Sequence, residues 1–549
     1  MLIWNETEKM SKRNEQLKTT LGAMAPVERV IEVNNIPTPD SVNIQGYEAY
    51  SLDDELRLLT MLNTLKLEPQ HYRTESETMI TLRDLIERIG VKDPYFICQA
   101  IKYSRCMRDG MRAINHLAAA LVSPFISGQD YAKRFYSSYN KKTQEGGCIF
   151  RPDDMSEIKE VYNALNQSTL SNAMKKGFAS AIENFDNYQL AKYRKTIRNI
   201  ANLVHPNSKK STAIINVDGK EMRTLDAIMQ GINVSADTWE VANSEAGQLV
   251  AQAVKDGKLD ETEAQKILSD AKNDNWESLL SEGKLGILAA LRNIRNMLID
   301  PRPAVINSLV ELISNPNAIR NGMIMPYQMD LAYEVVNQEF NYSPYKEIVQ
   351  NALTKGLETA IPNLSNALHG KTLVMIDCSG SMHDNCYQKG KRMNTTACKK
   401  AGLLTAMIAK ATNCDVIRFG SHAEYANYNV NDNVFSLANQ FSNTNMGGTN
   451  IASAFEYARK HRKSYDRIIL LSDNEANEGC TYKAYKNYVH DVCSPYIYAV
   501  DLAAYGTTPL KNDGKVNYYF GYGYQLFDDI ATMEFNPKAH IDKVRQVKI

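Results

Sequence analysis

The spacing of apolar residues changes abruptly at Lys371, and this change constrains the fold of the 549-residue chain more than any other feature. Before Lys371, apolar side chains recur every three or four residues, which is the spacing of one helix face. After it, short continuous apolar runs alternate with helical spacing, a pattern typical of buried strands joined by helices. The sequence therefore predicts a large all-α part followed by an α/β domain.

The predicted all-α part covers residues 51–366. Short connections between many amphipathic helices favour antiparallel stacking, as in HEAT-like arrays, which bury a continuous face that no single helix pair could cover. The first helix is expected behind a Ser51 cap, and a second is expected to stop at Gly90. Further helices are expected near residues 93–106, 110–123, 156–166, 169–184, 188–204, 260–272, 284–298, 303–314, 326–339 and 344–359.

Two segments depart from this helical pattern. Residues 1–50 include Pro26, Pro37 and Pro39 and are expected to form an extended N-terminal arm. Residues 205–235 are polar and predict an insertion with a short hairpin around 214–217.

Residues 367–549 predict a doubly wound α/β domain of the Rossmann-like type. Its first strand is the apolar run from Leu373 to Ile376. In such sheets, ligands bind at the carboxyl ends of the strands. The remaining elements are expected as helix 394–412, strand 416–419, helix 449–463, strand 467–472, helix 480–491, strand 496–502, strand 516–520 and helix 524–533.

Oxygen-bearing side chains gather in three loops expected at this edge of the sheet. Asp377, Ser379 and Ser381 follow the first strand, Thr449 opens a helix after Gly447-Gly448, and Asp473 ends the strand 467–472. Hydroxyls combined with a few carboxylates suit a hard dication such as Mg²⁺ better than His or Cys ligands do. A DxSxS turn alone is a common turn composition. The DxSxS, Thr and Asp loops together, in this order along the chain, predict one divalent cation at this edge of the sheet.

These loops resemble the metal-ion-dependent adhesion site of the von Willebrand factor A domain, which has the pattern DxSxS, then Thr, then Asp. The resemblance implies that Ser379, Ser381 and Thr449 bind the cation directly, and Asp377 and Asp473 directly or through water. It also implies one open coordination position for an acidic side chain of a partner. Glu475 and Asp384 lie close to these loops in sequence and are either outer ligands or solvated.

The chain has no net charge that would create a strong electrostatic field over its whole surface, because Lys+Arg and Asp+Glu both number 63. Residues 131–210 differ, with 14 basic and 7 acidic side chains. This window is the candidate anion-binding surface. Nine scattered cysteines without metal spacing suit reduced thiols, and no apolar run has the length of a signal peptide or a membrane span. We therefore expect a soluble cytoplasmic protein that does not bind membranes.

The basic residues of this window concentrate on the predicted helix 188–204. One side of the helix carries Tyr193, Ile197, Ile200 and Val204, and the other side carries the charges. A cationic helix face suits phosphate contact, although most such faces are merely solvated. The candidate RNA-binding residues are Lys175, Lys176, Lys192, Arg194, Lys195, Arg198, His205, Lys209 and Lys210, together with Arg292 and Arg295 as inner-surface or ion-pair candidates.

A helical array followed by an A domain resembles the Ro ribonucleoprotein family, whose helical part is called the TROVE domain. The segments that carry the resemblance are 176–193, 237–242, 288–294 and Pro326-Tyr327. The resemblance covers nearly the whole chain and implies a bacterial or phage-type Ro protein, in which the helices form a ring closed by the A domain. It implies that small Y RNAs bind the outer surface and that single-stranded ends of misfolded RNA enter the hole. A ring closed in this way would be a monomer.

Three alternative functions are consistent with these sequence features. The first is a ring-shaped scaffold that binds non-coding RNA in quality control or processing and catalyses no reaction. The second is a protein-interaction adaptor, in which the cation binds an acidic side chain of a partner such as an exoribonuclease. The third is a metal-dependent phosphohydrolase, which ranks last because no activated nucleophile and no HExxH, GxxxxGK[ST] or GxSxG motif is present.

Overall fold

The computed structural model describes residues 37–549 apart from 109, 167–168, 218, 233, 235–249, 251, 253, 255, 257–259, 323, 361–369, 389–390, 513, 522–524, 535 and 537. Most of the predicted N-terminal arm and the family-like segment 237–242 lie outside the described residues.

The first helical group follows the hydrophobic spacing of residues 54–229. Local caps fix the helix starts: Asp53 Oδ1 accepts a hydrogen bond from the Leu56 amide at 2.8 Å, and Thr74 and Glu77 form a capping box. Helices that are close in sequence pack on one another within this group. The group comprises α2 (Asp54–Thr64), α3 (Glu75–Gly90), α4 (Pro94–Lys102), the π-helical turn η1 (Tyr103–Met107), α5 (Arg112–Leu121), α6 (Ala132–Phe135), α7 (Pro152–Asn166), α8 (Asn172–Asn184), α9 (Asn187–Lys192), α10 (Arg194–Val204), the 3₁₀ turn η2 (Ser208–Lys210) and α11 (Thr224–Met229).

Two short hairpins interrupt this group. One pairs β3 (Tyr139–Asn140) with β4 (Glu145–Gly146). The other pairs β5 (Ile214–Val217) with β6 (Lys220–Arg223), which confirms the hairpin predicted around residues 214–217.

The second helical group continues the array from residue 261 to 360. Its helices pack in pairs, with α15 on α13 and α18 and with α14 on α17. Pro at the first turn of three of them suits a position whose amide has no helical partner. The group comprises α13 (Glu261–Ser281), α14 (Ile287–Met297), α15 (Pro303–Ile313), α16 (Pro316–Asn321), α17 (Pro326–Glu339) and α18 (Lys346–Ala360).

The structure differs from the sequence prediction at several places in the helical part, where α6, α16 and the hairpin of β3 and β4 were not predicted. The predicted helix 188–204 is broken at Tyr193, whose φ of −106° and ψ of 24° end α9 and begin α10. Ser51 does not cap a helix, because it lies in a strand and Asp53 is the cap. The end of the predicted arm is a hairpin of β1 (Ser41–Val42) and β2 (Glu48–Ser51). Strand β2 pairs with β14 (Thr507–Thr508) of the C-terminal α/β domain, residues 370–549, which we call the A domain.

The A domain is built on a six-stranded sheet in the order β11-β10-β7-β12-β13-β15, parallel except for the edge strand β11. The central strands β7 (Thr372–Asp377) and β12 (Arg467–Ser472) are buried at every position, which explains their continuous apolar runs. The other sheet strands are β10 (Asp415–Phe419), β11 (Ala423–Tyr425), β13 (Tyr496–Asp501) and β15 (Val516–Phe520). This sheet confirms the predicted doubly wound fold.

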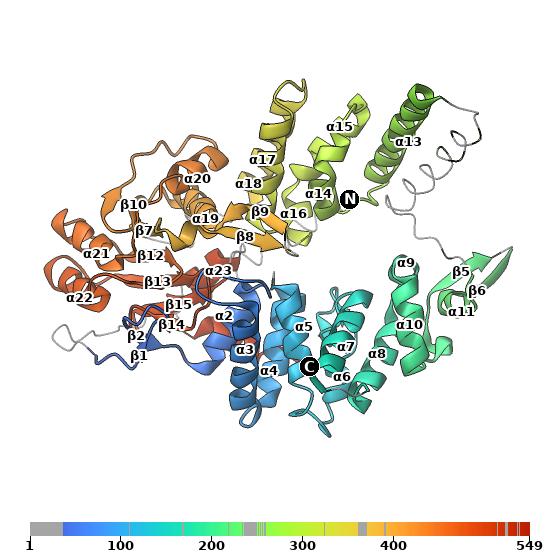
Figure 1. The fold of residues 1–549 in the computed structure, drawn as a ribbon, viewed down its shortest axis with the longest axis horizontal. Coiled ribbons are helices and arrows are strands. Elements are labelled where there is room, and N and C mark those ends of the chain that lie inside the picture. The colour runs from blue at the N-terminus through green and yellow to red at the C-terminus, as the bar shows by residue number, and fades with distance from the viewer. Residues whose placement is uncertain are drawn as a thin grey trace, which may run out of the picture.

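Helices lie on both sides of this sheet (Figure 1). They are α19 (Ala397–Thr412), α20 (Val434–Ser442), α21 (Ile451–Lys460), α22 (Thr481–Asp491), α23 (Gln525–Met533) and α24 (Ala539–Arg545), with the 3₁₀ turn η4 (Ser381–His383) after β7. A hairpin of β8 (Asn385–Gln388) and β9 (Lys391–Thr396) precedes α19. Helices α20 and α24 and this hairpin were not predicted from the sequence.

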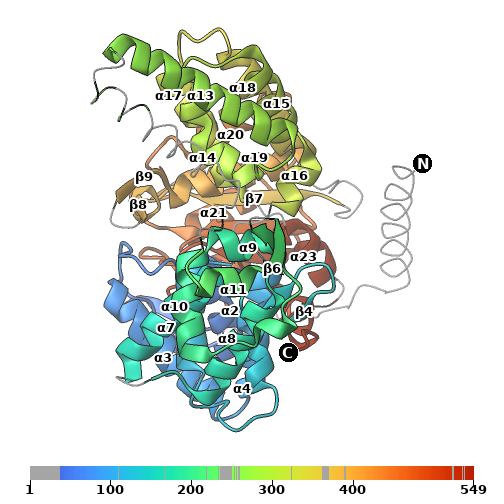
Figure 2. The same cartoon turned by 90° about the vertical axis from the view of Figure 1, so that its right-hand side faces the viewer.

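The A domain contacts both helical groups, which extend from it on the same side in Figure 1 and lie above and below strand β7 in Figure 2. On the first group, Gln99 Nε2 donates to the carbonyl of Val547 at 2.8 Å, and Lys102 Nζ donates to that of Lys548 at 2.6 Å. On the second group, Tyr333 stacks on Phe435 with 4.4 Å between ring centroids. The A domain therefore joins the two ends of the described helical array.

Over the described part of the chain, none of the helices combines the length and the apolar character needed to cross a bilayer. The eight cysteines that the structure describes are free thiols, and six of them are buried.

Candidate cation site and basic cavity

The predicted cation site is built on the turn that follows β7. Asp377 Oδ1 accepts a hydrogen bond from the Ser379 amide at 2.9 Å, an arrangement that folds the DxSxS segment back on itself. Ser472 Oγ, from the neighbouring strand β12, donates to Asp377 Oδ2 at 2.6 Å. The hydroxyls of Ser379 and Ser381 lie 3.3 Å apart. Three of the predicted ligands are thus within one tight turn.

The two other predicted loops are tied to this turn through their backbones. The Gly380 amide donates to the Gly447 carbonyl at 2.8 Å, and Gly447 has a φ of 86°, which favours glycine. The Asn477 amide donates to the Thr449 carbonyl at 2.9 Å, and Asn477 Oδ1 accepts from the Thr449 amide at 2.8 Å. The Thr449 loop therefore lies between the loops that carry Ser379 and Asp473.

The two carboxylates of the cation site are buried, with exposed fractions of 0% for Asp377 and 3% for Asp473. Burial, and then the charge of Asp473, raise the pKa of Asp377 to about 7. Burial also raises the pKa of Asp473, against hydrogen bonds from Ser381 and from the Glu475 amide. A bound cation would offset the cost of keeping both carboxylates ionised in this buried position.

The residues present fit a magnesium ion. Two buried carboxylates and three hydroxyls supply oxygen donors, which Mg²⁺ prefers. Within the described ranges, no cluster of three or more His, Cys, Asp or Glu side chains is arranged to hold a metal ion, so a metal at this edge would rely on the serine and threonine hydroxyls.

A second feature is a basic cavity of about 960 Å³ between the two helical groups. Helices α5 and α7 and the turn η1 line one wall, and α14 and α17 line the other. Two aromatic rings, Phe150 and Tyr327, also line it, and Lys66 Nζ and Lys400 Nζ lie 5.9 and 5.5 Å from the Tyr327 ring centroid. Seven basic side chains line the cavity, against the acidic Glu68 and Glu157: Lys66, Arg105, Arg108, Arg112, Arg151, Arg292 and Arg295.

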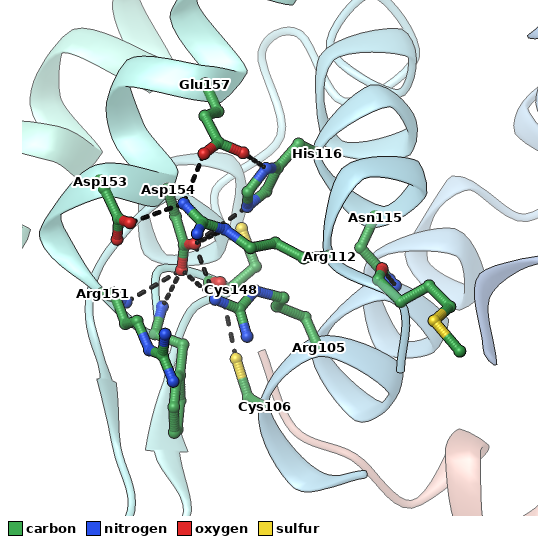
Figure 3. Close-up of polar contacts among 12 residues, drawn as sticks. Arg105, Cys106, Arg112, Asn115, His116, Cys148, Arg151, Asp153, Asp154 and Glu157 are labelled. Atoms are coloured by element: carbon green, nitrogen blue, oxygen red, sulfur yellow. Dashed lines mark hydrogen bonds and ion pairs between the residues drawn. The ribbon is translucent and has the colours of Figure 1, made fainter. Parts of the chain in front are cut away.

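A buried ion-pair cluster holds one wall of this cavity together (Figure 3). Asp154, which is fully buried, accepts from Arg105 Nη2 at 2.7 Å and from the Phe150 and Arg151 amides at 2.9 Å. His116 lies between two carboxylates, with Nε2 2.9 Å from Asp154 and Nδ1 2.7 Å from Glu157.

The cluster fixes the charge states of its members. Burial raises the pKa of Asp154, but Arg105 and His116 outweigh burial and hold the pKa below its usual range. Burial lowers the pKa of His116, but the hydrogen bonds to Asp154 and Glu157 outweigh burial and raise it. Arg112 Nη2 donates to Asp153 and Glu157 at 2.7 and 2.5 Å, so carboxylates orient this guanidinium at the cavity wall.

The predicted RNA-binding residues fall into two separate places. Arg292 and Arg295 line the basic cavity, and Arg295 also forms an ion pair with Glu339. The others form an outer basic surface on α8, α9, α10 and the segment after α10, comprising Lys175, Lys176, Lys192, Arg194, Lys195, Arg198, His205, Lys209 and Lys210.

Exposure within the outer basic surface is uneven. Lys192, Lys195 and Arg198 are exposed, whereas Ile197, Ile200 and Val204 on the other side of α10 are buried, as the helical spacing predicts. Arg194 is half-buried, and its Nη1 donates to the Val234 carbonyl at 3.2 Å. His205 is exposed and ends α10 in the left-handed region at φ 50°.

Sequence reasoning missed most basic residues of the cavity. Arg105, Arg108 and Arg112 are spaced by three and four residues, and this spacing could have indicated one helix face. The structure places them instead on a π-helical turn, on the residues after it and at the start of α5. Lys66 and Arg151 lie in loops and carry no comparable signal.

The two ends of the helical array are joined by an α/β domain, and this domain carries a DxSxS turn at its sheet edge. These features define a class of protein, the helical arrays closed by a von Willebrand factor A-type domain. Residues 371–494 match the family described as the Ro60 vWA domain. The chain is also similar in structure to the Ro protein (RSR) of Deinococcus radiodurans, at 15% sequence identity and a TM-score of 0.53, over 89% of this chain and 100% of that chain. A search of curated protein sequences finds no match.

The resemblance to the Ro family inferred from the sequence is thereby confirmed. Residues 371–494 are similar to the Ro60 vWA domain, and the fold of the chain is similar to that of the Deinococcus Ro protein.

Proposed function

We propose that this protein binds RNA and catalyses no reaction. In this proposal, a small structured non-coding RNA of the Y-RNA type lies on the outer basic surface, and a single-stranded end of a misfolded RNA enters the basic cavity. The observation that carries the proposal is the cavity of about 960 Å³ lined by seven basic and two acidic side chains.

The chemistry of the cavity suits an unpaired strand. Lysines and arginines neutralise phosphates, and aromatic rings such as Phe150 and Tyr327 offer faces on which bases stack. Two of the seven arginines and lysines are already engaged in buried ion pairs, Arg105 with Asp154 and Arg108 with Asp529. Arg112 also pairs with Asp153 and Glu157, and Arg295 pairs with Glu339. We assign phosphate contact to Arg151 and Arg292.

The outer basic surface suits a folded RNA. Lys192, Lys195 and Arg198 are exposed on adjacent turns of α9 and α10, and Lys176 is exposed on α8, which packs against α10. Ordered helices that present charges at fixed spacing can follow a phosphate backbone without reading its sequence. The Ro-type fold supports this assignment, because RNA binding is a property that the sequence resemblance implied.

We also propose that Asp377, Ser379, Ser381, Thr449 and Asp473 hold one Mg²⁺ ion. The donor set and the burial of both carboxylates support this proposal. The cation would supply a fixed positive charge at the rim of the sheet. We assign it no role in a reaction.

The experiment compares RNA retained by the native protein after crosslinking and sequencing. Charge reversal of Lys192, Arg194, Lys195 and Arg198 to Glu is expected to remove a defined structured RNA. Arg292→Glu is expected to reduce binding of a single-stranded probe more than binding of that structured RNA. The matched control reverses four exposed lysines of the A domain, Lys371, Lys460, Lys483 and Lys511, and should retain both. RNA binding by both variants at wild-type levels would reject the proposal.

A further inference from the structure

Strand β11 lies at the edge of the A-domain sheet and pairs with β10 on one side only. In an antiparallel pair, every second residue exchanges backbone hydrogen bonds with the partner strand. Two bonds that flank β11 set this alternation. The Gly420 amide donates to the His422 carbonyl at 2.9 Å, and the Ala426 amide donates to the Val416 carbonyl at 2.8 Å.

The same alternation turns the backbone groups of Ala423 and Tyr425 away from the sheet. Glu424, between them, faces Arg418 of β10. Across the part of the chain that the structure describes, no hydrogen bond engages the amide or the carbonyl of Ala423 or Tyr425. A strand edge with unpaired backbone donors and acceptors is a template for the addition of a further strand.

A pocket of about 660 Å³ opens beside the start of β11. The turn before β11, Ala423 and side chains of α21 line it. The ring of Tyr425 packs on α21, with its centroid 5.5 Å from that of Tyr457 and 5.3 Å from that of His461. Strand β11 and the residues that line this pocket therefore form one continuous surface, which we call the edge surface.

The end of α21 gives the edge surface its charge. Five consecutive basic side chains occupy residues 459–463, and Arg459, Lys460 and Arg462 line the pocket. The acidic side chains that line it, Glu456 and Asp491, both pair with Arg459 at 3.0 Å. Lys460 and Arg462 are exposed, so these are the charges that the pocket presents to a ligand.

We propose that the edge surface binds an extended acidic peptide of a partner protein. The peptide adds as a strand beside β11, its backbone pairs with Ala423 and Tyr425, and its acidic side chains lie against Lys460 and Arg462. A peptide fits better than RNA, because β11 offers hydrogen-bonding groups at the spacing of a strand, and Glu456 and Asp491 would repel phosphates. The edge surface contains none of the residues assigned to RNA or to the cation, so a protein partner could bind together with RNA.

The test uses the full chain and two fluorescein-labelled peptides. One is Glu-Asp-Glu-Val-Thr-Val-Thr-Val, and the other has the reversed sequence, so that the acidic block can reach the pocket in either strand orientation. Fluorescence anisotropy measures the affinity, and amide hydrogen exchange is followed for residues 421–426. At least one peptide is expected to bind and to slow this exchange. Replacement of its acidic residues by Gln and Asn, or N-methylation of alternate backbone amides, is expected to weaken binding about tenfold or more.

Two variants of the protein separate the contribution of charge from that of the strand edge. Lys460→Glu combined with Arg462→Glu is expected to bind the acidic peptide about tenfold or more weakly. Ala423→Pro removes an amide that points away from the sheet and leaves the bonds to β10 in place, a position at which edge strands accept proline. It is expected to weaken binding about fivefold. Lys483→Glu combined with Lys511→Glu changes exposed lysines elsewhere in the A domain and should bind as the wild type does.

Three outcomes would overturn the proposal. The first is the absence of binding of both acidic peptides to the wild type at about 1 mM. The second is wild-type affinity in the variant with Lys460 and Arg462 reversed. The third is slowed exchange of residues 421–426 by a single-stranded RNA but by neither peptide, which would identify a nucleic-acid site. RNA binding by the outer basic surface and the basic cavity is measured separately, so these outcomes leave the proposed function untouched.

Discussion

Arg108 of the helical array and Asp529 of the A domain form a buried ion pair, with Nη1 and Oδ2 2.6 Å apart. Tyr519 donates to the same carboxylate at 2.6 Å, and Lys543 pairs with its other oxygen. Burial raises the pKa of Asp529, but Arg108 and Lys543 outweigh burial and lower it to about 2. Removing one partner of such a pair leaves an uncompensated buried charge.

Asp529→Asn is therefore expected to destabilise the protein by about 3 kcal/mol, because Arg108 remains buried without its counter-charge. The shift of the urea midpoint measures this loss. Asp274→Asn removes a partner of Arg302 in an exposed ion pair and serves as the control, which should leave the midpoint unchanged. Equal midpoints for Asp529→Asn and the wild type would show that this pair does not hold the two parts together.

The cluster around His116 predicts a pH dependence with a definite sign. The raised pKa of His116 means that its contribution to stability is fully present below the unfolded value of about 6.5 and is lost as pH rises through the folded value. The lowered pKa of Asp154 means that its contribution is present above about pH 4 and is lost as pH falls through the folded value. Both contributions operate together between about pH 4 and pH 6.5.

Replacement of His116 by Asn is expected to lower the thermal midpoint most in that window, and the deficit should shrink as the pH rises to about 9. Thermal midpoints of wild type and variant across this range measure the difference. His205→Asn changes an exposed histidine at a left-handed position that asparagine tolerates, and it should follow the wild type throughout. A deficit of His116→Asn that is constant with pH would contradict a charged imidazole between the two carboxylates.

The positions of Asp377 and Asp473 at one sheet edge could be predicted from the sequence because each belongs to a local pattern at the end of a strand. Asp377 follows a fully buried apolar run, and Asp473 follows another, so the rule for parallel sheets places them at one edge. The order of strands and helices in the A domain and most helices of the array could also be predicted from local patterns. Hydrophobic periodicity is a local property that the fold preserves.

The contact of the α2–α3 connection with the loop after β7 could not be predicted in this way. His71 and Asp384 are separated by 313 positions, and nothing in either local sequence indicates the other. The break of the long predicted helix at Tyr193 could not be predicted either, because the helical spacing of apolar residues continues through this position. The position of Arg105 in the cavity could not be predicted either, because a π-helical turn changes the helix face from which a side chain points.

Magnesium is expected to stabilise the protein more strongly as pH rises. The pKa of Asp377 is raised to about 7, so without metal its favourable contribution is present below the unfolded value of about 3.9 and is lost as pH rises through about 7. A cation binds the ionised form and removes this loss. Thermal midpoints in EDTA and in saturating Mg²⁺ should therefore diverge between about pH 5 and pH 8.

Asp377→Asn is the control for this divergence, because it removes both the titrating group and a predicted ligand. Its thermal midpoints in EDTA and in Mg²⁺ should coincide at every pH. A Mg²⁺ effect of the same size in this variant and in the wild type would place the bound ion elsewhere.

Salt dependence can test whether the exposed charges of α9 and α10 contact phosphates. Each phosphate contact releases counterions, so the slope of log K against log salt falls in magnitude by about 1 for every contact removed. Replacing Lys192, Lys195 and Arg198 by Gln is therefore expected to reduce the slope for a structured RNA by up to about 3. Lys460, Lys483 and Lys511 replaced by Gln in the A domain should leave it unchanged. Weaker binding at an unchanged slope would mean that the three side chains stabilise the RNA-binding conformation without touching the RNA backbone.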